Sequence, residues 1–137
     1  MSNPFDMGAA SPEEMTVWRV DENIATAPSG VSSGPFEVQM LLSSRRDGEM
    51  TAMRALVPPG VVTHWHSHPC GQLLHVLDGV GLAQRQGGEV VELRRGDSVW
   101  FAPDERHWHG AAPQEPFSYI SIQPVKDGTA AHWFEPV

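Results

Sequence analysis

The stretch GVVTHWHSHPCGQLLHVLDG, residues 60–79, holds four of the seven histidines in the chain. Three of them, His64, His66 and His68, occupy alternate positions. Side chains at alternate positions of a β-strand point to one face, so these imidazoles would line one side of a strand. A divalent metal ion is bound by neutral imidazole nitrogens that converge on a point. The alternation therefore predicts a strand that carries metal ligands.

A second histidine segment repeats this alternation far along the chain. The sequence HWH, residues 107–109, follows the turn-like APDER of residues 102–106. Two short segments, each at the start of a strand, can meet across the inside of a barrel. Together with a glutamine four residues after the first segment, they predict a four-ligand set: His66, His68, Gln72 and His107. For Gln72 a second interpretation stays open, that of a core glutamine that only forms hydrogen bonds.

The rest of the chain reads as a series of short strands. Segments rich in Val, Leu, Ile and Trp lie at 16–20, 36–42, 51–57, 61–66, 72–78, 81–86, 89–93, 98–102 and 117–125. Turn-forming residues separate them, among them Asp78–Gly79 and the tight-hairpin pair Gly87–Gly88. Many short strands at regular spacing predict an all-β sandwich or barrel, and eight or more suit a jelly roll.

Length and composition limit the classes of protein to consider. The chain has 137 residues, and we expect a loose N-terminal arm over 1–15 and one domain over 16–137. The net charge of -8 argues against nucleic acid or an anionic membrane as the main partner. A single cysteine, Cys70, excludes an intrachain disulfide, and the first residues lack a signal-peptide layout. We therefore expect a cytoplasmic protein.

The two histidine segments resemble the two motifs of the cupin superfamily. Gly60, His66-x-His68, position 72 and Gly79 have the spacing of the first motif, and Gly96 with His107 that of the second. Three positions depart from the usual pattern: Gln72 replaces Glu, Ala102 replaces Pro, and Asp104 replaces Gly. The resemblance implies a single cupin jelly-roll barrel of six to eight strands with the metal inside.

A narrower resemblance concerns small single-domain cupins that include the manganese-dependent hydroxynitrile lyases. It rests on HSHPCGQ (66–72), VWFAPDERHWHGA (99–111) and DGTAAHWFEP (127–136). Tyr119 stands where those lyases have a histidine near the metal, and His64 where they have a small residue. The resemblance favours manganese as the one divalent transition metal per chain, while imidazole and amide ligands also suit Fe, Co, Ni or Zn.

Three further residues are candidates for catalysis. His109 shares a face with His107 by strand parity and is either an acid–base group, a support for a ligand, or a core histidine. Tyr119 would donate a hydrogen bond to a metal-bound oxygen or, as a second alternative, ionise where it approaches the metal. His64 would lie further toward the barrel mouth than His66.

These expectations lead to a metal-dependent enzyme that acts on a small oxygen-bearing substrate. Four neutral ligands would leave the ion its full charge and make it a strong Lewis acid. The family resemblance favours lyase chemistry of the hydroxynitrile-lyase type. Two alternatives stay open, an iron-dependent cupin dioxygenase and a non-catalytic sensing cupin. We also expect a homodimer, formed through an edge strand or the outer face of a sheet.

Overall fold

The computed structural model describes residues 10–137, which form an all-β structure without a helix. The first nine residues of the expected arm lie outside the described part, and residues 10–15 form no strand. The strands are β1 (Ile24–Thr26), β2 (Glu37–Leu42), β3 (Met50–Val57), β4 (His66–Ser67), β5 (Gln72–Arg85), β6 (Val91–Arg94), β7 (Ser98–Phe101), β8 (His107–Ala111), β9 (Phe117–Pro124) and β10 (His132–Trp133).

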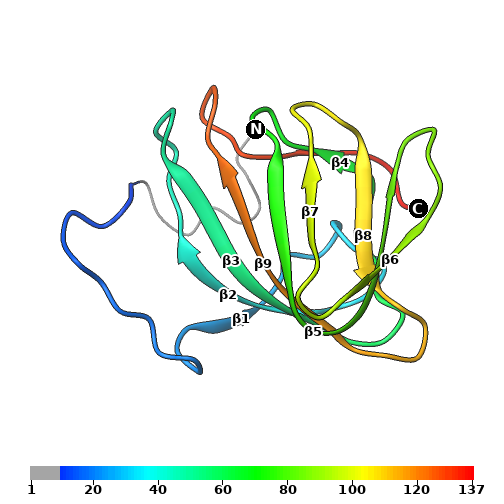
Figure 1. The fold of residues 1–137 in the computed structure, drawn as a ribbon. Helices are drawn as coiled ribbons and strands as arrows, with labels where there is room; N and C mark the ends of the chain where they lie inside the picture. Colours follow the sequence, from blue (N-terminus) through cyan, green and yellow to red (C-terminus); the bar gives the residue numbers. More distant parts are fainter. Residues whose placement is uncertain (1–9) are drawn as a thin grey trace.

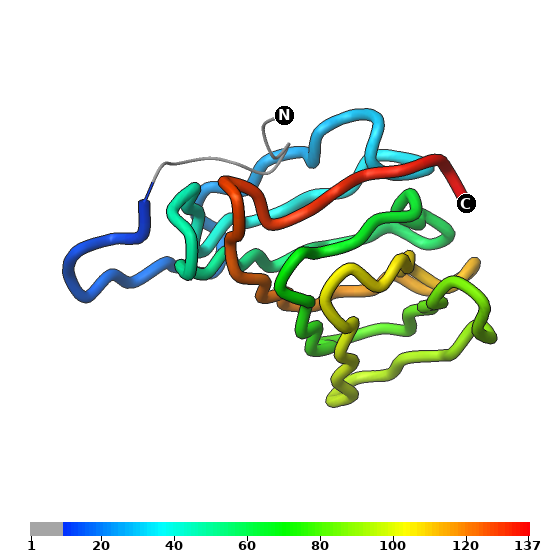
Figure 2. Tube along the Cα trace, turned by 90° about the horizontal axis from the view of Figure 1, so that it is seen from above, coloured from blue at the N-terminus to red at the C-terminus, as the bar shows by residue number. Residues whose placement is uncertain are grey.

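All strand pairs are antiparallel, and together they curl into the predicted jelly roll (Figures 1 and 2). One sheet runs β1-β2-β3-β9-β5, with β7 also on β5. The first half of β5 pairs with β9 and β7, and its second half pairs with β8 and β6. The second half thus begins another sheet, in which β8, β4 and β10 follow. The long, bent β5 joins the two walls of the barrel.

The bend of β5 corrects one prediction. Asp78–Gly79 was expected to be a turn between two strands, yet both residues lie inside β5 at a register shift against β9. Gly79 has a φ of 80°, and a Cβ there would lie 1.9 Å from the oxygen of Pro116. A glycine is therefore required at this bulge. The Gly87–Gly88 hairpin is confirmed, because β5 and β6 pair on either side of it.

Two other predicted strands differ in the structure. Residues 16–20 form no strand, since they have no partner strand; the Gln39 side chain binds the Arg19 carbonyl instead, at 2.7 Å. The segment leaves Val17 and Val20 exposed. In the predicted strand 61–66, only isolated bridges precede β4, which begins at His66.

The inner face of the first sheet changes character along the strands. Toward one end it carries Phe117, Val57 and Val76, all buried in the apolar core. Toward the other end it carries Thr51, Gln72 and Gln123, which are buried and polar. Buried polar groups need partners, so this end of the barrel is built for specific contacts rather than for packing alone.

The outer face of the same sheet is partly apolar. Leu73 pairs with Ile122 on one side and with Trp100 on the other, and Leu73 and Trp100 are exposed. The homodimer, through an edge strand or the outer face, stays a prediction. Within residues 10–137, no helix is long and apolar enough to cross a membrane.

Candidate metal centre

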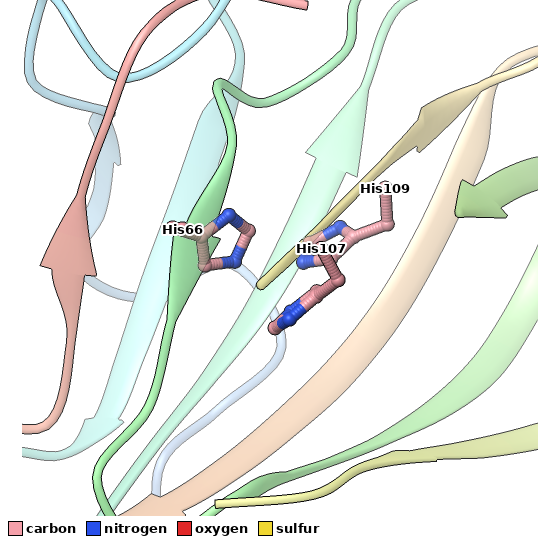
Figure 3. A group of neighbouring side chains, drawn as sticks. All are labelled: His66, His107 and His109. Carbon is pink, nitrogen blue, oxygen red and sulfur yellow. The ribbon is translucent and has the colours of Figure 1, made fainter. Parts of the chain in front are cut away.

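Three histidines from two neighbouring strands meet inside the barrel (Figure 3). His66 on β4 pairs directly with His107 on β8, and His109 lies two residues further along β8. One ring nitrogen from each of the three lies within 4.8 Å of those of the other two, and all three side chains are buried. This group could hold a metal ion.

Backbone carbonyls fix the ring orientation of three histidines at this site. Nδ1 of His66 lies 2.9 Å from the carbonyl of His64, and Nδ1 of His107 lies 2.9 Å from that of Glu105. Nδ1 of His68 lies 2.7 Å from the carbonyl of Ala130. A carbonyl only accepts hydrogen bonds, so each Nδ1 carries the proton and each neutral ring keeps a lone pair on Nε2.

At least two of these lone pairs meet no donor in the described part of the chain. Nε2 of His107 lies 3.3 Å from Oε1 of Gln72, whose Nε2 already donates to Gln123 at 2.9 Å. With Nδ1 of His107 protonated, no proton lies between these two acceptors. Nε2 of His68 and both ring nitrogens of His109 are buried without a hydrogen-bond partner in the described part of the chain. A cation satisfies such a set, and imidazole and amide donors fit a divalent transition metal.

The surroundings keep these histidines neutral. Burial lowers the pKa of His68 to about 3 and that of His107 to about 4. Burial, reinforced by the neighbouring histidines, also holds the pKa of His66 and His109 well below the usual range. Neutral imidazole is the form that binds metals, so the site is ready to take an ion at neutral pH.

The metal-free protein should therefore lose stability in mild acid. The pKa of these histidines is lower in the folded state, so the unfolded state binds more protons below its own pKa of about 6.5. Stability is complete above that pH and falls as the pH drops toward about 4, by up to about 1.4 kcal/mol per pH unit for each histidine. Urea unfolding of metal-free protein at several pH values measures this slope, and a flat profile would contradict neutral histidines.

The structure brings the four predicted ligands to one place. His66, His68, Gln72 and His107 are all buried, and the ring of His68 lies 5.0 Å from that of His66 and 5.4 Å from that of His107. Their assignment as ligands stays a prediction. His109 was not expected to be a ligand. One of its ring nitrogens nevertheless lies with those of His66 and His107 in the group that could hold a metal.

The other two catalytic candidates differ in position. The ring of Tyr119, on β9, meets that of His109 edge-on at 5.2 Å, and burial raises the pKa of its hydroxyl. Tyr119 is therefore a neutral donor close to the histidines. His64 precedes β4 and is half-buried; its carbonyl orients His66, while its neighbour Thr63 lines the cavity.

Several residues of the site were missed by sequence reasoning. Gln123 lies on the inward face of β9 with Tyr119, and strand parity alone could have found it. Thr63 accepts a hydrogen bond from the backbone of His109 at 3.2 Å. Trp133 stacks on His66 with ring centroids 4.5 Å apart. Strand parity could not place Thr63 and Trp133, because their segments form no long strand.

His66, His68 and His109 border a small cavity of about 30 Å³. Among the described residues, no acidic or basic side chain other than the neutral histidines lines it, and the segment with Ala130, Ala131 and Trp133 covers it where β10 pairs with β4. This volume holds roughly one or two water-sized groups. A wider open groove of about 570 Å³ lies at the apolar end of the sheet, and no histidine lines it. The candidate metal site therefore lies at the small cavity.

Comparison with known proteins gives consistent results. Residues 53–123 match the model of the Cupin domain family. The (R)-mandelonitrile lyase of Granulicella tundricola is 41% identical over 110 residues, which cover 80% of this chain and 84% of that protein. A cupin-like protein from Thermotoga maritima is 34% identical, with a TM-score of 0.79 over 87% of this chain and 90% of its own. A polyketide cyclase from Streptomyces resistomycificus shares only the fold, at 17% identity and a TM-score of 0.67 over 82% and 80% of the chains.

Proposed function

The chain belongs to the cupin family, and on that premise we propose that it is a metal-dependent lyase that splits a small hydroxynitrile into a carbonyl compound and hydrogen cyanide. The observation that carries the proposal is a pair of acceptors, Nε2 of His107 and Oε1 of Gln72, that lie 3.3 Å apart with no proton between them, close to Nε2 of His68, which is unpartnered among the described residues. The reaction class comes from the relative named as a mandelonitrile lyase. Its sequence covers most of this chain, including both histidine segments.

We assign the ligands by how their rings are held. His66, His68 and His107 each have Nδ1 anchored on a backbone carbonyl and present Nε2. Gln72 adds an amide oxygen. One divalent transition metal per chain, with manganese as the first candidate, would supply Lewis acidity toward the substrate hydroxyl.

His109 is the proposed base, because neither of its ring nitrogens has a hydrogen-bond partner among residues 10–137. It takes the proton from the substrate hydroxyl as the carbon–cyanide bond breaks and the carbonyl forms. The electron pair of the broken bond leaves with cyanide. Cyanide then takes the proton back from His109, which returns the ring to its neutral form. Tyr119, neutral and next to His109, donates a hydrogen bond to the oxygen or to the departing cyanide.

The small cavity predicts a preference for small substrates, and the ring of Trp133 limits the size of the cavity. Trp133→Ala removes the ring that covers the histidines, so it should raise kcat/KM for mandelonitrile relative to lactonitrile by about tenfold or more. Steady-state kinetics on both substrates measures the ratio. Trp100→Ala, which removes an exposed tryptophan on the outer face, is the matched control. An unchanged ratio in Trp133→Ala would contradict this role.

The direct test of the proposed function is aldehyde and cyanide release from lactonitrile and mandelonitrile. The protein is loaded with manganese and assayed with and without oxygen. We expect release in both conditions, because the balanced reaction consumes no oxidant. Oxygen uptake with iron-loaded protein, without cyanide release, would replace the lyase by the dioxygenase. Tight metal binding without turnover on either substrate would favour a sensing cupin.

A further inference from the structure

A chain of hydrogen bonds crosses three neighbouring strands behind Gln72. On β3, the Thr51 hydroxyl donates to the backbone carbonyl of Gln123 at 2.8 Å. On β9, Nε2 of Gln123 donates to the Thr51 carbonyl at 3.2 Å and to the Thr51 hydroxyl oxygen at 2.7 Å. On β5, Nε2 of Gln72 donates to Oε1 of Gln123 at 2.9 Å. The chain ends at Oε1 of Gln72, which faces His107.

The direction of every bond in this chain follows from two backbone carbonyls. The carbonyl of Gln123 can only accept, so the Thr51 hydroxyl must donate to it and is left to accept from Gln123. The carbonyl of Thr51 can only accept, so the side-chain NH₂ of Gln123 must point toward β3. Oε1 of Gln123 then points toward β5, and Gln72 must turn its own NH₂ to it. The oxygen of Gln72 is left facing the histidines.

Reversing either amide would be costly at this place. Thr51, Gln72 and Gln123 are 5%, 3% and 8% exposed, so water offers little compensation for a lost bond. A flipped Gln123 would set its oxygen against the Thr51 carbonyl, and a flipped Gln72 would set its oxygen against Oε1 of Gln123. The backbone of β3 and β9 thus dictates which atom of Gln72 enters the site.

We propose that Gln123 and Thr51 are positioning residues that hold the amide oxygen of Gln72 toward the histidines. The inference rests on the proposed metal site and adds how its amide ligand is oriented. It also accounts for glutamine rather than glutamate at position 72. A carboxylate there would place an acceptor against Oε1 of Gln123, with no proton to share.

Two substitutions at one position separate positioning from structural support. Neither Gln123→Leu nor Gln123→Glu can donate to Thr51 as the amide does, but Gln123→Glu still accepts from Nε2 of Gln72. We expect Gln123→Leu to weaken Mn²⁺ affinity by about 10- to 100-fold, the usual effect of losing a residue that orients a ligand. Gln123→Glu should weaken the affinity less, because its carboxylate still accepts from Nε2 of Gln72 and keeps the amide oxygen toward the histidines. Calorimetric titration with Mn²⁺ measures both, and equal loss in both variants would mean a structural role only.

The far end of the chain offers a conservative rescue. Thr51→Val removes the hydroxyl but keeps the shape of the side chain, and it should weaken Mn²⁺ binding, whereas Thr51→Ser keeps the hydroxyl and should bind like the parent. In a Gln72→Ala background, Gln123→Leu should have no further effect on the affinity. An additional loss of affinity in that background would overturn the proposal, because Gln123 would then not act through Gln72.

A measurement without metal keeps this inference separate from the proposed function. In metal-free protein, the side-chain NH₂ of Gln72 should show one strongly downfield-shifted proton by NMR, and Gln123→Leu should abolish that shift. If the parent protein shows the shift but binds no Mn²⁺, the metal site fails and the orientation stands. A parent protein that binds Mn²⁺ without that shift, with Gln123→Leu unchanged in affinity, would overturn the orientation alone.

Discussion

Replacing His66 and His68 together with alanine is expected to reduce bound divalent metal from roughly one ion per chain to none. The substitution removes two buried Nε2 donors whose rings are held in place by the carbonyls of His64 and Ala130. The remaining donors cannot enclose an ion. Elemental analysis of protein expressed in defined medium gives the metal content, and circular dichroism verifies the fold.

The control for this loss is a histidine outside the site. His75 lies on β5 three residues after Gln72, but its side chain is exposed and contacts Ser98 on the outer face. His75→Ala should keep the full metal content. Undiminished metal in the double variant would exclude His66 and His68 as ligands. The proposed ligand set would then be wrong.

The parity of side chains along strands explains why so much of the site was predictable. Alternation placed His66 and His68 on the inside, and the same rule placed His107 with His109. Gln72 was found because the corner after His68 leads directly into β5. The same rule accounts for His75, which is out of phase with Gln72 on β5 and is exposed. The alternation of side chains needs only a few strand residues to be recognised, so it holds even where the flanking turn departs from the usual motif.

The features that parity could not supply depend on contacts distant in sequence. The carbonyl of Ala130 fixes the His68 ring from 62 residues away. Trp133 reaches His66 only because β10 pairs with β4. Asp78–Gly79 was predicted to be a turn because an Asp-Gly pair occurs both in turns and at β-bulges. Only the close approach of Pro116 to Gly79 distinguishes the bulge from the turn. Such choices are made by the whole fold rather than by the local sequence.

The role of His109 is the point on which the chemistry of the site depends. Its ring nitrogen lies with those of His66 and His107 in the group that could hold a metal. Its ring differs from theirs in one respect, because no carbonyl fixes its tautomer. A ligand benefits from a fixed ring, whereas a group that takes and returns a proton benefits from a free nitrogen. On this basis we assign His109 to proton transfer and His68 to the metal.

His109→Ala is accordingly expected to retain roughly one metal ion per chain and to lose about a hundredfold or more in kcat for hydroxynitrile cleavage, the usual range when a general base is removed. The matched control is His64→Ala, whose ring does not line the cavity and whose carbonyl remains to orient His66, so its kcat should stay near that of the parent. Metal content and kcat are measured on the same preparations. If His109→Ala loses the metal while His68→Ala retains it, His66, His107 and His109 form the metal site, and His68, whose Nε2 is unpartnered among the described residues, becomes the candidate base.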